Sequence, residues 1–364
     1  MQYVFEQHVS RASADLMPAI RRQQETVRFQ PAPLQAGAFY LTPPGGSALP
    51  TYTEWQVDQS GVLPPVAAAR REVTDAAERA GKADRDLFLQ SLWWEVADHV
   101  MAWLALDAEL EVLDREVAAF EAVHAAVSAR FEAGEATVME VEQARWGVAK
   151  STTERSDLKA RRESLRLQIA GMCKGEKPVL VVTPGRYAAL GPLELPAEGW
   201  SEEAAVEAAA GYAEADRVRA ERERLPEWTL GYNAQGVTGE VYGGVFAGLA
   251  IPLRGARSRS ELAALEAAKV RHEGAQRLAQ AAADRAVWKE RYDALLQVRP
   301  LWSEALADAG AGLDLAQTSG HLTVVELHQL INARFQAERE LIHLDEELRR
   351  LRARLLTSIE MPQP

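Results

Sequence analysis

Apolar side chains recur at alternating steps of three and four residues along a stretch without glycine or proline, between Gly81 and Gly134. The repeating positions are Leu89, Leu92, Val96, His99, Trp103, Leu106, Leu110, Leu113, Val117, Phe120, His124, Val127 and Phe131. This heptad spacing predicts one helix over about 66–131, whose seam must be covered by partner helices along its whole length. The uninterrupted part alone would be about 78 Å long, far beyond an ordinary globular helix.

Similar spacing predicts a second long helix over about 256–317. Pro300 should interrupt it with a kink near Gln297, because proline removes one backbone hydrogen bond. Shorter helices over about 138–172 and 323–359 each follow a glycine-containing turn. Each long helix and its shorter successor should therefore form a helical hairpin, which makes the fold mainly α.

A small β part precedes each helical hairpin. Aromatic-dotted segments bounded by turn residues predict two strand pairs, at about 31–42 with 51–63 and at about 227–236 with 240–253. A helix precedes each pair, and the second of these covers about 201–224. The Pro- and Gly-rich segment over about 177–200 is expected to be an irregular connector.

The two halves of the chain repeat one order of elements: helix, two strands, long helix, turn and shorter helix. Three residue pairs near the hairpin turns have the same separation: Gly134 and Gly320, Thr137 and Thr323, Glu140 and Glu326. This pattern predicts an internal duplication with a period of roughly 190 residues. The first structural repeat covers 1–190 and the second covers 191–364.

Composition excludes several classes of protein. The chain carries 53 acidic and 41 basic residues, a formal net charge of −12, and lacks a dense basic block, so a nucleic-acid partner is not expected. Its single cysteine, Cys173, rules out an intrachain disulfide and a Cys-rich zinc site. We find no nucleophile–base or metal constellation, so we expect neither an enzyme nor a bound cofactor.

Four strands cannot close a barrel alone, because closure needs about eight strands or more. Two long helical hairpins with exposed seams would likewise be unstable without neighbours. These two constraints predict a ring-shaped homo-oligomer in which sister copies complete both parts.

Four phrases of the sequence match a known pattern. They are AVSARFEAGEATVMEVEQA at 126–144, its degenerate twin GHLTVVELHQLINA at 320–333, and the strand-to-helix phrases TEWQVDQSGVLPP and GGVFAGLAIPLRGARSR. With the duplication, they make the chain resemble the TolC-like outer membrane factors, particularly the CzcC-like and CusC-like branch that serves heavy-metal efflux. The resemblance covers nearly the whole chain.

The resemblance implies a TolC-like fold and a homotrimer, with a 12-stranded β-barrel in the outer membrane and an α-barrel of helical hairpins as a periplasmic tunnel. It implies a passive exit duct of a tripartite, RND-type efflux system for metal cations or small toxic compounds. The expected partners are a periplasmic adaptor protein, an inner-membrane RND pump and outer membrane lipid. A periplasmic adaptor or coiled-coil scaffold of an efflux or secretion complex is the alternative. The N-terminus has no signal-peptide pattern, which indicates truncation or a misplaced start.

The resemblance also implies roles for residues at the hairpin turns. Adaptor contacts map to Gly134, Thr137, Gly320 and Thr323. The acidic periplasmic gate maps to Glu140 and Glu326, with Gln329 where the family has a second acid. The family's basic and aromatic latch residues are replaced by Leu322 and Gln317, so a gate locked by a salt bridge is not expected.

Structural roles compete with these functional ones. The glycines and threonines suit turns and helix caps, and an acid in the first turn of a helix is stabilised by the helix dipole. His321 and His328 near the second tip, and Glu95 with His99 at helical spacing, could bind a metal. We favour solvated or packing roles for them, because a structural metal site needs about four ligands.

Overall fold

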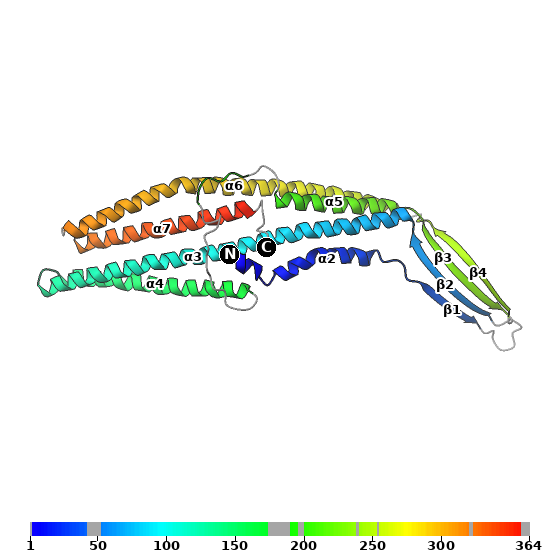
Figure 1. Cartoon of the computed structure of the whole chain (residues 1–364), viewed down its shortest axis with the longest axis horizontal. Coiled ribbons are helices and arrows are strands. Elements are labelled where there is room, and N and C mark those ends of the chain that lie inside the picture. The colour runs from blue at the N-terminus through cyan, green and yellow to red at the C-terminus, as the bar shows by residue number, and fades with distance from the viewer. Residues whose placement is uncertain are drawn as a thin grey trace. The chain divides into compact units, whose positions relative to one another are not determined.

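The computed structural model describes residues 2–41, 52–173, 190–195, 200–237, 240–252, 255–319 and 323–357. Its elements, in chain order, are α1 (Gln2–Glu6), α2 (Arg11–Arg28), β1 (Gln35–Leu41), β2 (Tyr52–Val62), α3 (Pro64–Glu132), α4 (Val138–Met172), α5 (Ser201–Arg222), β3 (Glu227–Val237), β4 (Glu240–Ala250), α6 (Ala256–Ser319) and α7 (Val324–Thr357) (Figure 1). The mainly helical fold with a small antiparallel sheet is the one that the sequence predicts.

The chain forms two compact units, and each unit contains segments from both sequence halves. The first comprises Met1–Ala12, Phe88–Trp200 and Ala281–Pro364, and the second comprises Ser13–Leu87 and Ser201–Gln280. The division into two repeats at residue 190 therefore does not correspond to a division into compact units, and the duplication itself stays a prediction.

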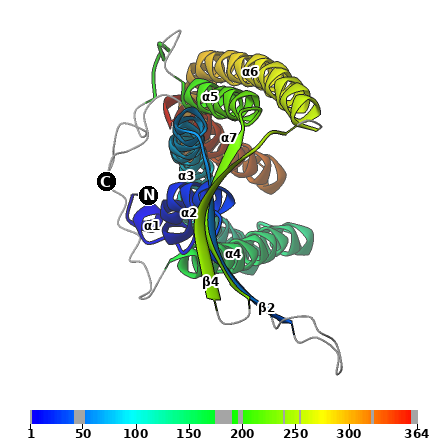
Figure 2. The ribbon, with the colours of Figure 1, turned by 90° about the vertical axis from the view of Figure 1, so that its right-hand side faces the viewer.

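The first unit is helical. Ion pairs from Arg155 to Asp114 and from Arg162 to Asp107 join α4 to α3. The pair between Arg299 and Asp345 joins α6 to α7. In both views of the ribbon, α4 and the part of α6 in this unit lie apart, with α7 between them (Figures 1 and 2). The two helical hairpins expected from the sequence are present.

The α3 seam is buried over most of its predicted length, although Phe131 at its end is 43% exposed. The helix also buries positions outside the strict heptad, including Trp93, Val100, Val112 and Val123. Near the tip, an apolar cluster joins residues of α3, α4 and α7. A second helix therefore covers α3 from another side, which broadens the buried stripe beyond the seam of a two-stranded coiled coil.

The second long helix spans nearly the residues expected from the sequence and includes Pro300, while the kink expected near Gln297 stays a prediction. The helix α6 continues as an α-helix from Ala256 to Ser319 through Pro300. A proline removes a single intrahelical hydrogen bond, and packing of the flanking turns can retain the helix across that loss. Tyr292 and Leu348, both fully buried, belong to the apolar cluster between α6 and α7 beside this segment.

The second unit contains the sheet, whose order is β1-β2-β3-β4 with every neighbouring pair antiparallel. The central β2–β3 pair joins the two sequence halves in a register that matches Trp55 with Ala234 and Val57 with Tyr232. In the part of the chain that the structure describes, β1 and β4 each have only one strand neighbour. The sheet therefore has two free edges.

A cluster of rings and charges joins the helices beside this sheet. Arg28 of α2, Arg70 of α3 and Arg219 of α5 place their guanidinium groups 5.2 to 5.5 Å from the centre of the Phe29 ring. Glu223 pairs with both Arg70 and Arg219, at 3.0 and 2.7 Å. Such cation–π and ion-pair contacts fix the directions in which the three helices approach the strands.

Among the described residues, no helix contains a stretch long and apolar enough to cross a bilayer.

Candidate functional site at the hairpin tips

The first tip is a tight turn between α3 and α4. Gly134 has a φ of +77°, a left-handed conformation that glycine adopts without a steric penalty. Its N–H donates to the Phe131 carbonyl at 3.0 Å, and the Glu135 N–H donates to the Arg130 carbonyl at 2.8 Å. This pair of bonds is a Schellman motif, which satisfies the last carbonyls of α3 and reverses the chain.

A capping box begins α4 directly after this turn. The Glu140 N–H donates to the Thr137 hydroxyl oxygen at 3.3 Å, and the Thr137 N–H donates to Oε2 of Glu140 at 2.7 Å. The Thr137 hydroxyl also donates to the same carboxylate oxygen at 2.9 Å. The box satisfies two backbone N–H groups that the helix leaves without internal partners.

The second tip repeats this geometry at the start of α7. Glu326 accepts the Thr323 N–H at 2.9 Å and the Thr323 hydroxyl at 2.8 Å, and its own N–H donates back to that hydroxyl oxygen at 3.3 Å. Gln329 is exposed one turn further along α7. The predicted site residue Gly320 lies outside the described residues, as do His321 and Leu322, and the structure does not describe the Gln317 side chain.

The capping bonds also set the charge of both carboxylates. Hydrogen bonds from the backbone N–H and then the hydroxyl of Thr137 lower the pKa of Glu140. The matching bonds from Thr323 lower the pKa of Glu326. Each tip therefore presents an ionised carboxylate that is held in one orientation near the surface.

His328 is packed inside the first unit. Its ring lies 4.6 Å from the ring of Phe120, and a side chain added at Gly147 would meet it at 2.7 Å. Burial, followed by the charge of Lys150, lowers the pKa of His328. The glycine thus allows α7 to approach α4 closely, and His328 fills the space as a packing residue.

The Glu95–His99 pair gains no further metal ligand among the described residues. Nδ1 of His99 lies 2.8 Å from the backbone carbonyl oxygen of Glu95, within its own helix. No group of three potential His, Cys, Asp or Glu ligands occurs in the part of the chain that the structure describes.

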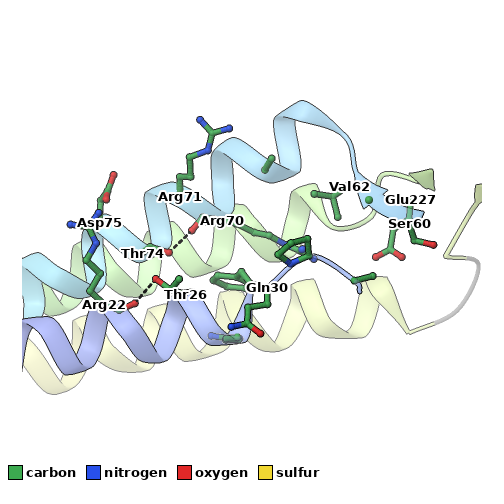
Figure 3. Close-up of a pocket in the computed structure, with 16 residues that line it drawn as sticks. Arg22, Thr26, Gln30, Ser60, Val62, Arg70, Arg71, Thr74, Asp75 and Glu227 are labelled. Atoms are coloured by element: carbon green, nitrogen blue, oxygen red, sulfur yellow. Dashed lines mark hydrogen bonds between the residues drawn. The ribbon is translucent and has the colours of Figure 1, made fainter. Parts of the chain in front are cut away.

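A cavity of about 810 Å³ lies in the second unit where the ends of α2, α3 and β2 meet (Figure 3). Three of its arginines are already paired: Arg22 with Glu78, Arg28 with Asp216 and Arg70 with Glu223. The Thr26 and Thr74 hydroxyls donate to carbonyls of their own helices, as the dashed lines show. The polar groups of the cavity serve the junction of these elements instead of converging on one ligand.

Sequence reasoning missed two buried carboxylates in the first unit. Glu109 and Glu116 of α3 are 5% and 2% exposed and face α7, where His343 and Arg339 are their nearest partners, each at 3.3 Å. Their separation by one heptad, next to positions of the predicted seam, was the available signal.

No protein-family model matches the sequence, and no curated protein sequence matches it. The structural likeness is close. The chain superposes on CusC with a TM-score of 0.79 and 14% identity over 98% of this chain and 90% of that chain. VceC from Vibrio cholerae gives a TM-score of 0.79 at 16% identity, over 98% of this chain and 94% of that chain. OprN gives a TM-score of 0.78 at 17% identity, over 98% of this chain and 88% of that chain.

The names of these neighbours refer to the outer membrane or to a transmembrane channel. The work on CusC concerns folding and transmembrane channel formation, VceC is an outer membrane protein, and OprN is an outer-membrane channel. The fold shared with them is the TolC-like fold, as the resemblance of the sequence implies. At these identities, the likeness establishes the fold of this chain.

We expect Thr323→Ala to raise the pKa of Glu326 towards its usual value near 4.5, because the alanine removes the hydroxyl that donates to the carboxylate. The pKa of Glu326 is lower in the folded state than in the unfolded state. The capping bonds therefore stabilise the tip at pH values above the unfolded-state pKa, and this stabilisation is lost as the pH falls through the folded-state pKa. Carboxyl NMR titration of the labelled full chain measures the shift. Thr153→Ala, which removes an exposed hydroxyl within α4, is the control. An unchanged Glu326 titration in Thr323→Ala would show that the capping bonds do not hold this carboxylate.

Proposed function

We propose that the chain is one subunit of a trimeric outer membrane channel, a passive exit duct of a tripartite, RND-type efflux system. One observation carries this proposal: one face of the sheet is mostly apolar and exposed, whereas the four carboxylates of the strands all lie on the other face. The TolC-like fold supports the same conclusion.

The strand register defines the two faces. Because side chains alternate along a strand, residues paired across the ladder share a face. One face carries Tyr40, Trp55, Val57, Trp228, Leu230, Tyr232, Val241, Val245 and Leu249. Among these, Trp55 is 64% exposed and Val245 is 75% exposed. An exposed, continuous apolar surface of this kind fits contact with lipid.

The opposite face is polar in the two central strands, where it carries Glu54, Gln56, Asp58, Ser60, Thr229, Asn233 and Gln235. In the outer strands it also carries Phe39, Tyr242 and Phe246. Asn233 donates to Glu54 at 2.6 Å, and the Ser60 and Thr229 hydroxyl oxygens lie 3.0 Å apart. Alternation of apolar and polar residues along strands is typical of barrels that face lipid outside and water inside.

The free strand edges and the outer helices support a trimer. Lipid tolerates strands only in a closed ladder, and three copies of this sheet suffice for closure. The outer helices α4 and α6 each expose an apolar seam. At heptad-related spacing, α4 exposes Met139, Trp146 and Leu167, and α6 exposes Val287 and Leu301. Two different seams on opposite sides of one subunit are what a closed ring requires.

The tips are the proposed contact points with other components. Gly134, Thr137 and Thr323 are exposed, and with Gly320 they would contact a periplasmic adaptor that links the duct to an inner-membrane RND pump. The gate would comprise Glu140, Glu326 and Gln329. Carboxylates held by capping boxes would form a negative ring in the trimer, which favours cations. The resemblance to the heavy-metal branch supports metal cations or small toxic compounds as the cargo.

The membrane assignment is tested by Val245→Arg at the centre of β4. The arginine would be placed in lipid, and we expect a loss of about 2 to 4 kcal/mol in the free energy of insertion into phospholipid vesicles. Asn233→Arg on the polar face of β3 is the matched control and should insert and conduct in planar bilayers. Equal insertion of both variants, or a wild-type chain that stays in water without conductance, would contradict the channel.

The trimer is tested by Trp146→Glu, which places a charge in the exposed α4 seam. We expect the complex in detergent to shift from the mass of three subunits towards that of one, as measured by light scattering, because the subunit contact would have to bury that charge. Lys159→Glu, an exposed α4 position outside the stripe, should leave the mass unchanged. A wild-type chain that is monomeric under the same conditions would argue against the assembly.

The gate is tested by Glu326→Gln. Glutamine can retain a capping box, so the tip should keep its fold while the ring loses its charge. We expect reversal potentials across a salt gradient to show reduced preference for cations. Glu266→Gln, which removes an exposed acid of α6 away from the α7 tip, should leave the selectivity unchanged. Unaltered selectivity in Glu326→Gln would remove the assigned role.

A further inference from the structure

The contact between α7 and α3 contains two layers of buried charge, one heptad apart. Glu109 and Glu116 are on α3, and their partners His343 and Arg339 are one turn apart on α7. Both carboxylates are almost completely removed from water, at 5% and 2% exposure. An ionised carboxylate at such a position must be compensated by its neighbours, because burial disfavours charge.

Compensation in the Glu109 layer is incomplete. Nε2 of His343 lies 3.3 Å from Oε1 of Glu109, yet this oxygen accepts no hydrogen bond. The imidazole carries charge only when it is protonated. The other charged groups that face Glu109 are Glu346 and Arg339 on α7 and Arg161 on α4. Glu346 is itself paired with Arg350 and adds negative charge to the layer.

Compensation in the Glu116 layer is shared. Nη1 of Arg339 lies 3.3 Å from Oε2 of Glu116 and 3.2 Å from Oε2 of Glu154 on α4, so one cation serves two carboxylates. Oε2 of Glu116 accepts no hydrogen bond. Lys150 on α4, the remaining cation facing this layer, lies 3.8 Å from Glu154.

We propose that the seam between α7 and the α3–α4 pair is a pH-responsive contact, which tightens when Glu109 and Glu116 take up protons and loosens when both are ionised. A neutral carboxyl group avoids the cost of a buried charge and gains an O–H donor. The seam joins one helical hairpin to the other, so the device would regulate how firmly the two hairpins hold together. It is a property of the subunit and does not depend on the channel function.

The direction follows from the local energetics. Burial, the largest cause, raises the pKa of Glu109, and Glu346 adds to the rise against His343 and the arginines. Burial also raises the pKa of Glu116, with Glu154 adding to it against Arg339 and Lys150. The folded-state pKa values of both carboxyl groups lie above the unfolded-state pKa near 4.5. Protonation of the two groups therefore stabilises the folded seam fully below that pH, and this stabilisation is lost as the pH rises through the folded-state pKa values.

Hydrogen–deuterium exchange of the full chain tests the proposal at about pH 5 and about pH 8, after correction for intrinsic exchange rates. We expect protection of the amides around 105–120 and 336–346 to fall by about threefold to tenfold at the higher pH. The upper limit is set by linkage, because each released proton changes the folding equilibrium by at most a factor of ten per pH unit. The double variant Glu109→Gln and Glu116→Gln should be highly protected at both pH values.

Glu111→Gln is the matched control, because Glu111 is an exposed acid of α3 between the two layers. This variant should retain the wild-type pH dependence. Protection of the wild type that does not change with pH would overturn the proposal, as would a pH dependence that survives in the double variant. Should the double variant fail to fold by circular dichroism, each single variant is expected to remove part of the dependence, and full dependence in both would equally overturn it.

Discussion

The structure depends on apolar surface that one chain cannot bury. In the described part of the chain, four strands form a sheet with one mostly apolar face, carboxylates on the other face and two free edges. Exposed backbone groups at such edges are costly wherever water is absent. The outer helices α4 and α6 leave apolar seams uncovered in the same way. In the proposed assembly, a closed ring of copies with lipid around the strands would remedy both deficits. Channel function would then follow from closure, since a ring that satisfies every edge encloses a lumen.

The helical hairpins combine this apolar packing with charge. Near the tip, α3, α4 and α7 share an apolar cluster, and one heptad-spaced pair of acids lies buried between α3 and α7. Buried ion pairs contribute little net stability, because desolvation offsets their attraction. What such pairs add is a dependence of packing on protonation. Apolar residues at Glu109 and Glu116 would hold the helices together without that dependence.

The tips show how structural and functional roles can reside in the same residues. Thr137 with Glu140 and Thr323 with Glu326 close capping boxes, which accounts for their spacing without reference to a partner. The same bonds keep both carboxylates ionised and oriented. A gate built from capping residues would need no further side chains to hold its charges in place.

The sequence by itself determined the kinds of elements and most of their limits. Heptad spacing and the absence of breakers defined α3, and glycine-containing turns with threonine caps located the starts of α4 and α7, because these signals are local in the chain. The helix expected around Pro300 continues through that residue, and the kink expected there stays a prediction. Only the tertiary structure decided which strand faces which, that Glu109 and Glu116 meet α7, and that His328 packs on Phe120 over Gly147. These contacts join residues distant in sequence, and their energies depend on burial and register, which no local pattern specifies.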